Sequence, residues 1–302
     1  MSAQTLISDD SVAAFHLDGA PVRGRYARLD GATIDAILHR HDYPRPVALL
    51  LGEALTLVAL IGSLLNIEGR LVLQAEGEGL VSMLVAEWRS GGALRGYARL
   101  SEEARATLAR ENAMAPAKLL GNGALALTLD QGAERPRHQG FVALTGDTLA
   151  ACAEAYFEQS EQTPTRIKLT VAEEYERGTR AGYRAGGALI QRVAGDTARG
   201  DTDEDWSRAT ILLATLTEQE LVDPALGADV ILYRLFHEEG VRMNAPETLE
   251  DKCDCDRERL VTVMKRFSDE ELAGMVELDG LLHARCEFCS RTYLVAPEDL
   301  RR

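Results

Sequence analysis

Four cysteines near the C-terminus constrain what this chain can fold into more than any other feature of its sequence. They form two tight pairs, Cys253 with Cys255 and Cys286 with Cys289, which are separated by residues 256–285. Four thiolates brought together as a tetrahedron suit zinc better than the other common biological cations. The closeness within each pair also lets the pair oxidise on itself. We therefore expect one Zn²⁺ per chain in the reduced state, with these four side chains as its ligands.

The size and charge of the chain limit its partners. Its 302 residues, 46% of them hydrophobic, can bury at least one sizeable core and are most consistent with two domains. The net charge of −15 argues against nucleic-acid binding, because phosphate recognition needs clustered lysines and arginines. The same charge repels anionic lipid. We expect neither a nucleic-acid nor a membrane partner.

The N-terminus and the number of cysteines point to the cytoplasm. The opening segment, residues 1–19, carries acidic residues and has no basic stretch followed by an apolar run, so we predict no secretory signal. In the reducing cytosol, cysteine pairs more often bind metal or do redox chemistry than form permanent disulfides. The fifth cysteine, Cys152, lies among alanines in a helix-like run. We expect it to be a small buried side chain, with a part in the redox chemistry as the alternative.

Residues 1–195 predict an α+β domain of mixed sheet and helix. Apolar positions that recur every three or four residues predict helices at 50–67 and 147–162. Residues 69–88 predict two strands joined by a Gly-Glu-Gly turn, and the alternation at 123–132 predicts another strand.

The segment 50–67 is the most apolar stretch of the chain. Glu53 interrupts it, and polar or charged residues flank it closely. We therefore expect a buried core helix rather than a membrane span.

Residues 196–250 predict a helical linker. The segment opens with a polar, Gly- and Asp-containing run, loosest at 195–205, and continues as amphipathic helices that need a partner surface. Thr217 followed by Glu220 predicts a capping box, and the sequence DPALG at 223–227 marks a helix break.

The last segment, residues 251–302, predicts a small zinc-binding domain with one helix at 269–278. About fifty residues cannot bury enough surface to fold strongly alone, whereas a structural zinc contributes roughly 10–16 kcal/mol of apparent binding energy that is also folding energy. If each cysteine pair closed its own disulfide instead, each tiny loop would contribute about 1.5–2 kcal/mol, or roughly 3–4 kcal/mol together. We therefore predict that oxidation unfolds this segment rather than locking it.

Other interpretations of the four cysteines stay open at this point. A purely structural zinc knuckle is one, and a zinc ribbon that recruits RNA or a transcription component is another, although the net charge weighs against the second. A thiol-disulfide oxidoreductase is a third, but Cys286 lacks the thioredoxin-like strand-CxxC-helix context, and zinc would occupy the thiols. His283 is not expected to be a ligand, because four cysteines complete a tetrahedron.

From the sequence, we predict that the chain is not an enzyme. It contains no GxSxG nucleophile elbow, no GxxxxGK[ST] phosphate loop and no HExxH helix. A closed four-sulfur site also leaves no open coordination position for catalysis.

Motifs over most of the chain resemble the thirty-three-kilodalton heat-shock protein family, the redox-regulated holdase chaperones of the bacterial cytosol. The most specific are YFEQSEQTPT at 156–165 and the CxC pair followed, about thirty residues later, by CxxC. HDYP at 41–44, LLGEA at 50–54, RGYA at 95–98 and LYRLFHEE at 232–239 add to the match.

This resemblance implies a switch. The reduced protein would be an inactive monomer with zinc on the four cysteines. Oxidation would pair Cys253 with Cys255 and Cys286 with Cys289, release zinc, unfold the terminal domain and destabilise the linker. Family members then dimerise and hold unfolding client proteins without ATP, and the missing nucleotide loop fits this. Candidate apolar contributors to client binding are Trp206, Ile211, Leu212, Leu213, Leu216, Leu232, Leu235 and Phe236.

Overall fold

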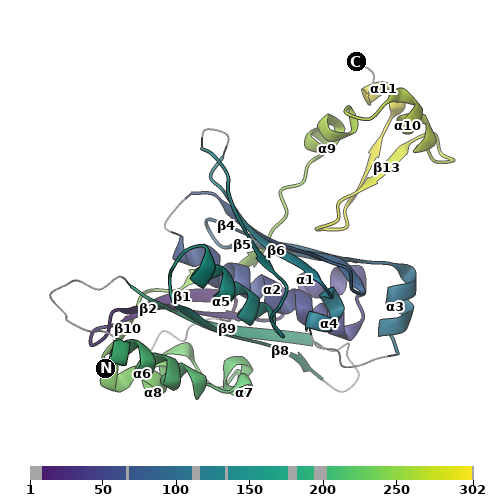
Figure 1. The fold of residues 1–302 in the computed structure, drawn as a ribbon. Helices are drawn as coiled ribbons and strands as arrows, with labels where there is room; N and C mark the ends of the chain where they lie inside the picture. The colour runs from purple at the N-terminus through teal and green to yellow at the C-terminus, as the bar shows by residue number, and fades with distance from the viewer. Residues whose placement is uncertain are drawn as a thin grey trace. The chain divides into compact units, whose positions relative to one another are not determined.

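The structure is a computed structural model whose described residues fall into two compact units, Met1–Asp251 and Lys252–Arg302 (Figure 1). The predicted α+β class is confirmed, because helices and sheets mix in the described chain. The three-part division at residues 195 and 250 stays a prediction. The described residues are 9–65, 68–110, 116–132, 135–175, 182–193 and 203–300.

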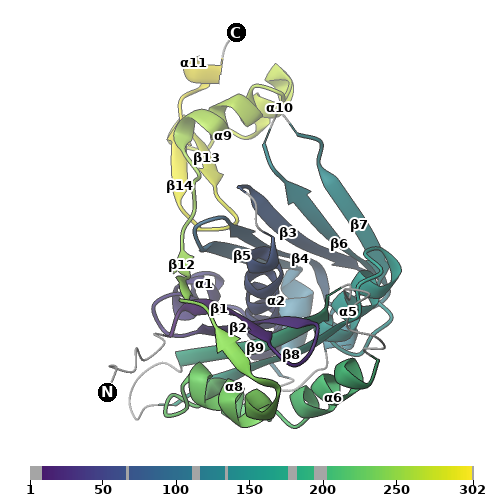
Figure 2. The same ribbon diagram turned by 90° about the vertical axis from the view of Figure 1, so that its left-hand side faces the viewer.

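Helix α2 (Arg45–Leu64) is the centre of the first unit. Pro44 precedes it and Pro46 lies in its first turn, where a missing backbone N–H costs nothing. By length and composition the helix could cross a membrane, but 83% of its most apolar 18-residue stretch is buried inside the fold. It contacts strands of both large sheets, which lie on its two sides (Figure 2). The prediction of a buried core helix at 50–67 is confirmed, except that residues 66 and 67 lie outside the described residues.

One sheet of the first unit, sheet A, lies against one side of α2. Its strand order is β10-β1-β2-β9-β8, and β11 also pairs with β1. The strands are β1 (Ser11–Leu17), β2 (Val22–Leu29), β8 (Thr165–Glu174), β9 (Gly182–Arg192), β10 (Val241–Met243) and β11 (Glu247–Thr248).

The second sheet, sheet B, covers the other side of α2 in the order β12-β5-β4-β3-β6-β7. The predicted hairpin at 69–88 is confirmed as β3 and β4, and the strand predicted at 123–132 is β6. The strands are β3 (Arg70–Gly77), β4 (Val81–Arg89), β5 (Ala93–Leu100), β6 (Gly123–Asp130), β7 (His138–Ala143) and β12 (Glu250–Asp251).

Short helices complete the first unit around these sheets. The helix predicted at 147–162 is α5 (Leu149–Gln159), and the Thr148 hydroxyl caps it by accepting a hydrogen bond from the N–H of Ala151. The other helical segments are α1 (Ile34–Leu38), η1 (His39–His41), α3 (Glu102–Leu108) and α4 (Pro116–Leu120).

The linker segment packs on the face of sheet A that points away from α2, as Figure 2 shows for α6 and α8. Its helices are α6 (Asp203–Ala214), α7 (Glu218–Val222), α8 (Ala228–Phe236) and η3 (His237–Glu239). The predicted capping box of Thr217 and Glu220 opens α7, and the predicted break at 223–227 separates α7 from α8. Of the loose run expected at 195–205, residues 195–202 lie outside the described residues.

The second unit holds short elements around a very small core. The helix predicted at 269–278 is shorter, because α10 ends at Gly274, and Val276 then bridges to Leu282. Among its described residues, only Met264, Leu282, Val295 and Leu300 form a buried apolar cluster. The elements are α9 (Arg257–Met264), α10 (Asp269–Gly274), β13 (Leu282–Arg285), β14 (Thr292–Val295) and α11 (Pro297–Leu300).

Candidate metal centre

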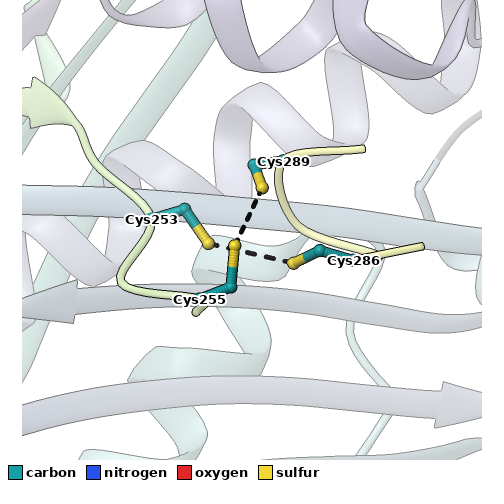
Figure 3. A group of neighbouring side chains, drawn as sticks. All are labelled: Cys253, Cys255, Cys286 and Cys289. Carbon is teal, nitrogen blue, oxygen red and sulfur yellow. Dashed lines mark hydrogen bonds between the residues drawn. The ribbon is translucent and has the colours of Figure 1, made fainter. Parts of the chain in front are cut away.

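The structure brings together the four cysteines that the sequence singles out. Cys253 and Cys255 lie in the extended segment before α9, and Cys286 and Cys289 lie in the turn between β13 and β14. All four Sγ atoms are within 4.8 Å of one another, and Figure 3 shows the side chains converging from these two segments. Among the described residues, no other group of this kind is found.

Backbone hydrogen bonds fix the turn between β13 and β14, which carries Cys286 and Cys289. The N–H of Cys286 donates to the carbonyl of Arg291 at 2.9 Å, and the N–H of Ser290 donates to the carbonyl of Cys286 at 2.8 Å. Ser290 adopts a left-handed backbone with φ of 58°, which turns the chain sharply after Cys289. These bonds hold the CxxC pair at the tip of the hairpin.

The sulfur spacing fits a tetrahedral zinc site. A Zn–S bond of 2.3 Å corresponds to an edge of about 3.8 Å between sulfurs of a regular tetrahedron. The Sγ atoms of Cys253 and Cys286 are 3.9 Å apart, and those of Cys255 and Cys289 are 3.2 Å apart. Soft thiolate donors, four in number and partly buried, are the set that zinc prefers. The residues present therefore fit this metal.

Tyr293 links the two halves of the cluster, and sequence reasoning missed it. Its hydroxyl donates to the backbone carbonyl of Cys255 at 2.8 Å and lies 3.3 Å from the Sγ of the same residue. Tyr293 comes from β14, four residues after Cys289, so it ties the CxC segment to the hairpin. The only signal in the sequence is an aromatic residue inside a short alternating strand.

The hydrogen bonds around Cys255 favour its thiolate. Burial opposes ionisation, but hydrogen bonds from the Tyr293 hydroxyl and from the neighbouring thiols outweigh it and lower the pKa of Cys255 to about 7. One thiol of the cluster is therefore readily ionised, as a metal ligand must be.

The other residues weighed from the sequence lie where they were expected. Cys152 is buried in the core of the first unit, 3% exposed, and burial raises the pKa of its thiol. His283 is not part of the sulfur cluster, and its Nε2 lies 2.8 Å from a carboxylate oxygen of Asp279.

The candidate client-binding residues mostly lie in the interface between the linker helices and sheet A. Leu213, Leu216, Leu232, Leu235 and Phe236 are buried there against β1, β2 and β9, and Trp206 and Leu212 are partly buried. Ile211 is 63% exposed and points away from this cluster. In this state the apolar face is therefore covered.

Two cations of sheet A hold the linker by its backbone. Lys168 of β8 donates to the carbonyls of Ala214 and Leu216 at 2.7 and 2.6 Å, where α6 ends. Arg28 of β2 is only 5% exposed and donates to three further linker carbonyls. These contacts depend on the fold of the linker and not on its side chains.

Comparisons with known proteins agree on one family. A family model described as Hsp33 protein matches residues 10–296. The 33 kDa chaperonin of Caulobacter vibrioides is 48% identical over 298 residues, which cover 98% of each chain. The 33 kDa chaperonin of Escherichia coli is 34% identical over 291 residues, covering 96% of this chain and 94% of the relative.

A solved structure shares the fold. The crystal structure of the 33 kDa chaperonin from Thermotoga maritima aligns with a TM-score of 0.76 over 96% of both chains, at 23% identity.

Proposed function

The chain belongs to the Hsp33 family, and we propose that it is a redox-regulated, ATP-independent holdase that binds unfolding proteins under oxidative stress. The observation that carries the proposal is the group of four convergent thiols in a unit whose apolar core is very small. Such a unit depends on its cross-link for folding, so a chemical change at the sulfurs becomes a change of structure.

In the reduced state, Cys253, Cys255, Cys286 and Cys289 would hold one zinc ion. Bound zinc supplies a structural cross-link there and keeps the sulfurs as thiolates. The Tyr293 hydrogen bond to the carbonyl of Cys255 also joins the segment of Cys253 to the β13–β14 hairpin. The reduced protein would be an inactive monomer.

Oxidation would convert these thiols to two disulfides. Each bond forms when two thiolates, released from zinc, give two electrons to an oxidant such as hydrogen peroxide, which takes up two protons from the solvent and becomes two water molecules. The family resemblance proposes the pairs Cys253–Cys255 and Cys286–Cys289. The Sγ–Sγ contacts at 3.9 and 3.2 Å join members of different pairs, so local pairing requires the side chains to turn within the cluster.

Loss of the cross-link would unfold the second unit and then loosen the linker. Two disulfides across very short loops constrain the unfolded chain by only roughly 3–4 kcal/mol, which is less than a bound zinc contributes. The linker helices would leave the apolar face of sheet A, and the side chains buried there would become available to clients. We propose that the active form is a dimer and that the protein works in the cytoplasm.

The assay for this function is suppression of citrate synthase aggregation on heating, without ATP. The reduced, zinc-loaded protein is expected to leave aggregation unchanged, and the same sample after peroxide treatment is expected to suppress it. A Cys152→Ser variant serves as the control for cysteine content and should keep this difference. Equal, absent activity in both redox states would contradict the holdase proposal.

A further inference from the structure

Residues Val241–Asp251 run along the edges of both large sheets, and the second unit begins at the next residue. We call this segment the strap. Its first part, β10 and β11, pairs with β1 of sheet A, and its last part, β12, pairs with β5 of sheet B. Figure 2 shows it leaving the end of α8, passing β1 and continuing to β12.

The strap occupies the backbone hydrogen-bonding groups on one side of β1. The N–H of Asn244 donates to the carbonyl of Ala14 at 2.9 Å, and the N–H of Leu249 donates to the carbonyl of Asp10 at 2.8 Å. In an antiparallel ladder, the N–H and C=O of alternate residues point to the same side. The backbone groups of Val12, Ala14 and His16 therefore face the strap.

The intervening residues of β1 face the opposite way. By the same alternation, Ala13 and Phe15 direct their N–H groups toward β2. Hydrogen exchange of the first set of amides therefore reports on pairing with the strap. Exchange of the second set reports on pairing with β2.

Side chains hold the strap mainly at its two ends. Val241 and Met243 pack against the apolar cluster between sheet A and the linker, and Arg242 pairs with Asp18. Leu249 is its one fully buried side chain, 1% exposed, and its carbonyl accepts a hydrogen bond from the Thr33 hydroxyl at 3.2 Å. Asp251 pairs with Arg40, and the N–H of Glu250 donates to the carbonyl of Gly92 at 3.0 Å. The remaining residues are partly or fully exposed. Between these side-chain contacts, the β1 edge binds the strap through backbone groups.

We propose that release of the strap uncovers the edge of β1, and that this edge then takes an extended segment of a client protein as a new strand of sheet A. The inference rests on the proposed holdase function. The strap ends at Asp251, two residues before Cys253, so it is directly continuous with the segment that carries the sulfur cluster. An uncovered strand edge pairs with any extended chain through main-chain hydrogen bonds.

A client segment suits this edge better than a second copy of the chain. Unfolding proteins expose extended segments of unrelated sequence. A strand edge that binds through main-chain hydrogen bonds can pair with segments of many different sequences.

Two adjacent glycines provide a matched pair of variants. Gly91 and Gly92 both have left-handed backbones, with φ of 88° and 86°. A Cβ on Gly92 would lie 1.9 Å from the carbonyl oxygen of Thr248 in the strap, whereas a Cβ on Gly91 would meet nothing within 4 Å. Gly92→Ala should therefore displace the strap, and Gly91→Ala carries similar backbone strain without that clash.

The test is residue-resolved amide hydrogen exchange of β1, run beside the aggregation assay. In the reduced protein, both sets of β1 amides should exchange slowly. After oxidation, the amides of Val12, Ala14 and His16 should exchange about tenfold faster or more, while those of Ala13 and Phe15 stay slow. Adding heat-unfolding citrate synthase should slow the first set again. Reduced Gly92→Ala should show the fast pattern without oxidant, and reduced Gly91→Ala should not.

The outcomes separate the strap from the holdase function. Suppressed aggregation with strap-side amides that stay slow after oxidation, or stay fast when client is bound, would leave the holdase function in place and overturn the strap proposal. Strap-side amides that become slow as protein concentration rises, without client, would show that a second copy occupies the edge. Fast exchange of Ala13 and Phe15 would show that sheet A itself has opened, which also contradicts the proposal.

Discussion

At the scale of single residues, Glu53 is the most unusual group in the core helix. It sits in the middle of α2, the most apolar stretch of the chain, and is partly buried. Burial, followed by the negative charge of Glu218 on α7, raises the pKa of Glu53 to about 7. Near neutral pH this carboxyl therefore changes charge inside the first unit.

The raised pKa predicts that the fold weakens as pH rises. The ordinary glutamate value is 4.5, so between that value and about 7 the folded state holds a proton that the unfolded state has lost. The free energy of unfolding should therefore fall across this window, by about 3 kcal/mol in full. Urea unfolding at about pH 5 and pH 8 measures the fall, and Glu53→Gln should remove it.

Glu218→Gln is the matched control for this prediction. It removes only the smaller, charge-repulsion part of the shift and should keep most of the pH dependence. If wild type and Glu53→Gln lose the same free energy of unfolding between the two pH values, the carboxyl does not titrate in the fold as proposed.

At the scale of elements, the contact of the linker with sheet A depends on Arg28. Its guanidinium donates to the carbonyls of Glu220, Leu221 and Leu226 at 3.3, 3.2 and 2.8 Å, around α7 and the loop that follows. Without it, all three carbonyls would lose this donor, and the bond to the carbonyl of Leu221 is a buried one.

Arg28→Met should therefore loosen α7 by about 2–4 kcal/mol of local stability. Amide exchange over residues 217–228 of the reduced protein measures the change. Arg23→Met, on the same strand, is the control, because the Arg23 guanidinium is exposed and bonds the Gln191 side chain instead. Equal exchange in the two variants would mean that Arg28 does not hold the linker.

The elements that the sequence predicts are those with local signals. Helix α2, the β3–β4 hairpin and the capping box of α7 each follow from periodicity, turn residues or cap spacing within a few positions. Strand β9 is buried on both faces and shows no alternation, so its pattern did not distinguish it from other apolar runs. The strap is harder still, since it pairs two or three residues at a time with strands more than 150 positions away.

The residues of the metal centre also differ in whether the sequence predicts them. The four cysteines are visible as a motif because the spacing of ligands is a local property. Tyr293 is not, because its role depends on a hairpin folding back against the CxC segment.

At the scale of the whole molecule, a large core and a small terminal unit differ in what stabilises them. The first unit buries a central helix between two sheets, whereas the second has four buried apolar side chains among its described residues. Chemistry at the sulfurs should therefore change the second unit first and leave the α2 core folded. On our proposal, the covered face of sheet A and the strap are the parts of the first unit that respond to that change.

The central claim is that the oxidised form is less folded than the reduced form. The most direct measurement is limited proteolysis of residues 252–302 during peroxide treatment at mildly elevated temperature, with zinc release followed in the same samples. We predict that this segment becomes cleavable as zinc leaves, while the first unit around α2 stays resistant. A segment 252–302 that remains fully resistant after all zinc has been released would contradict the account.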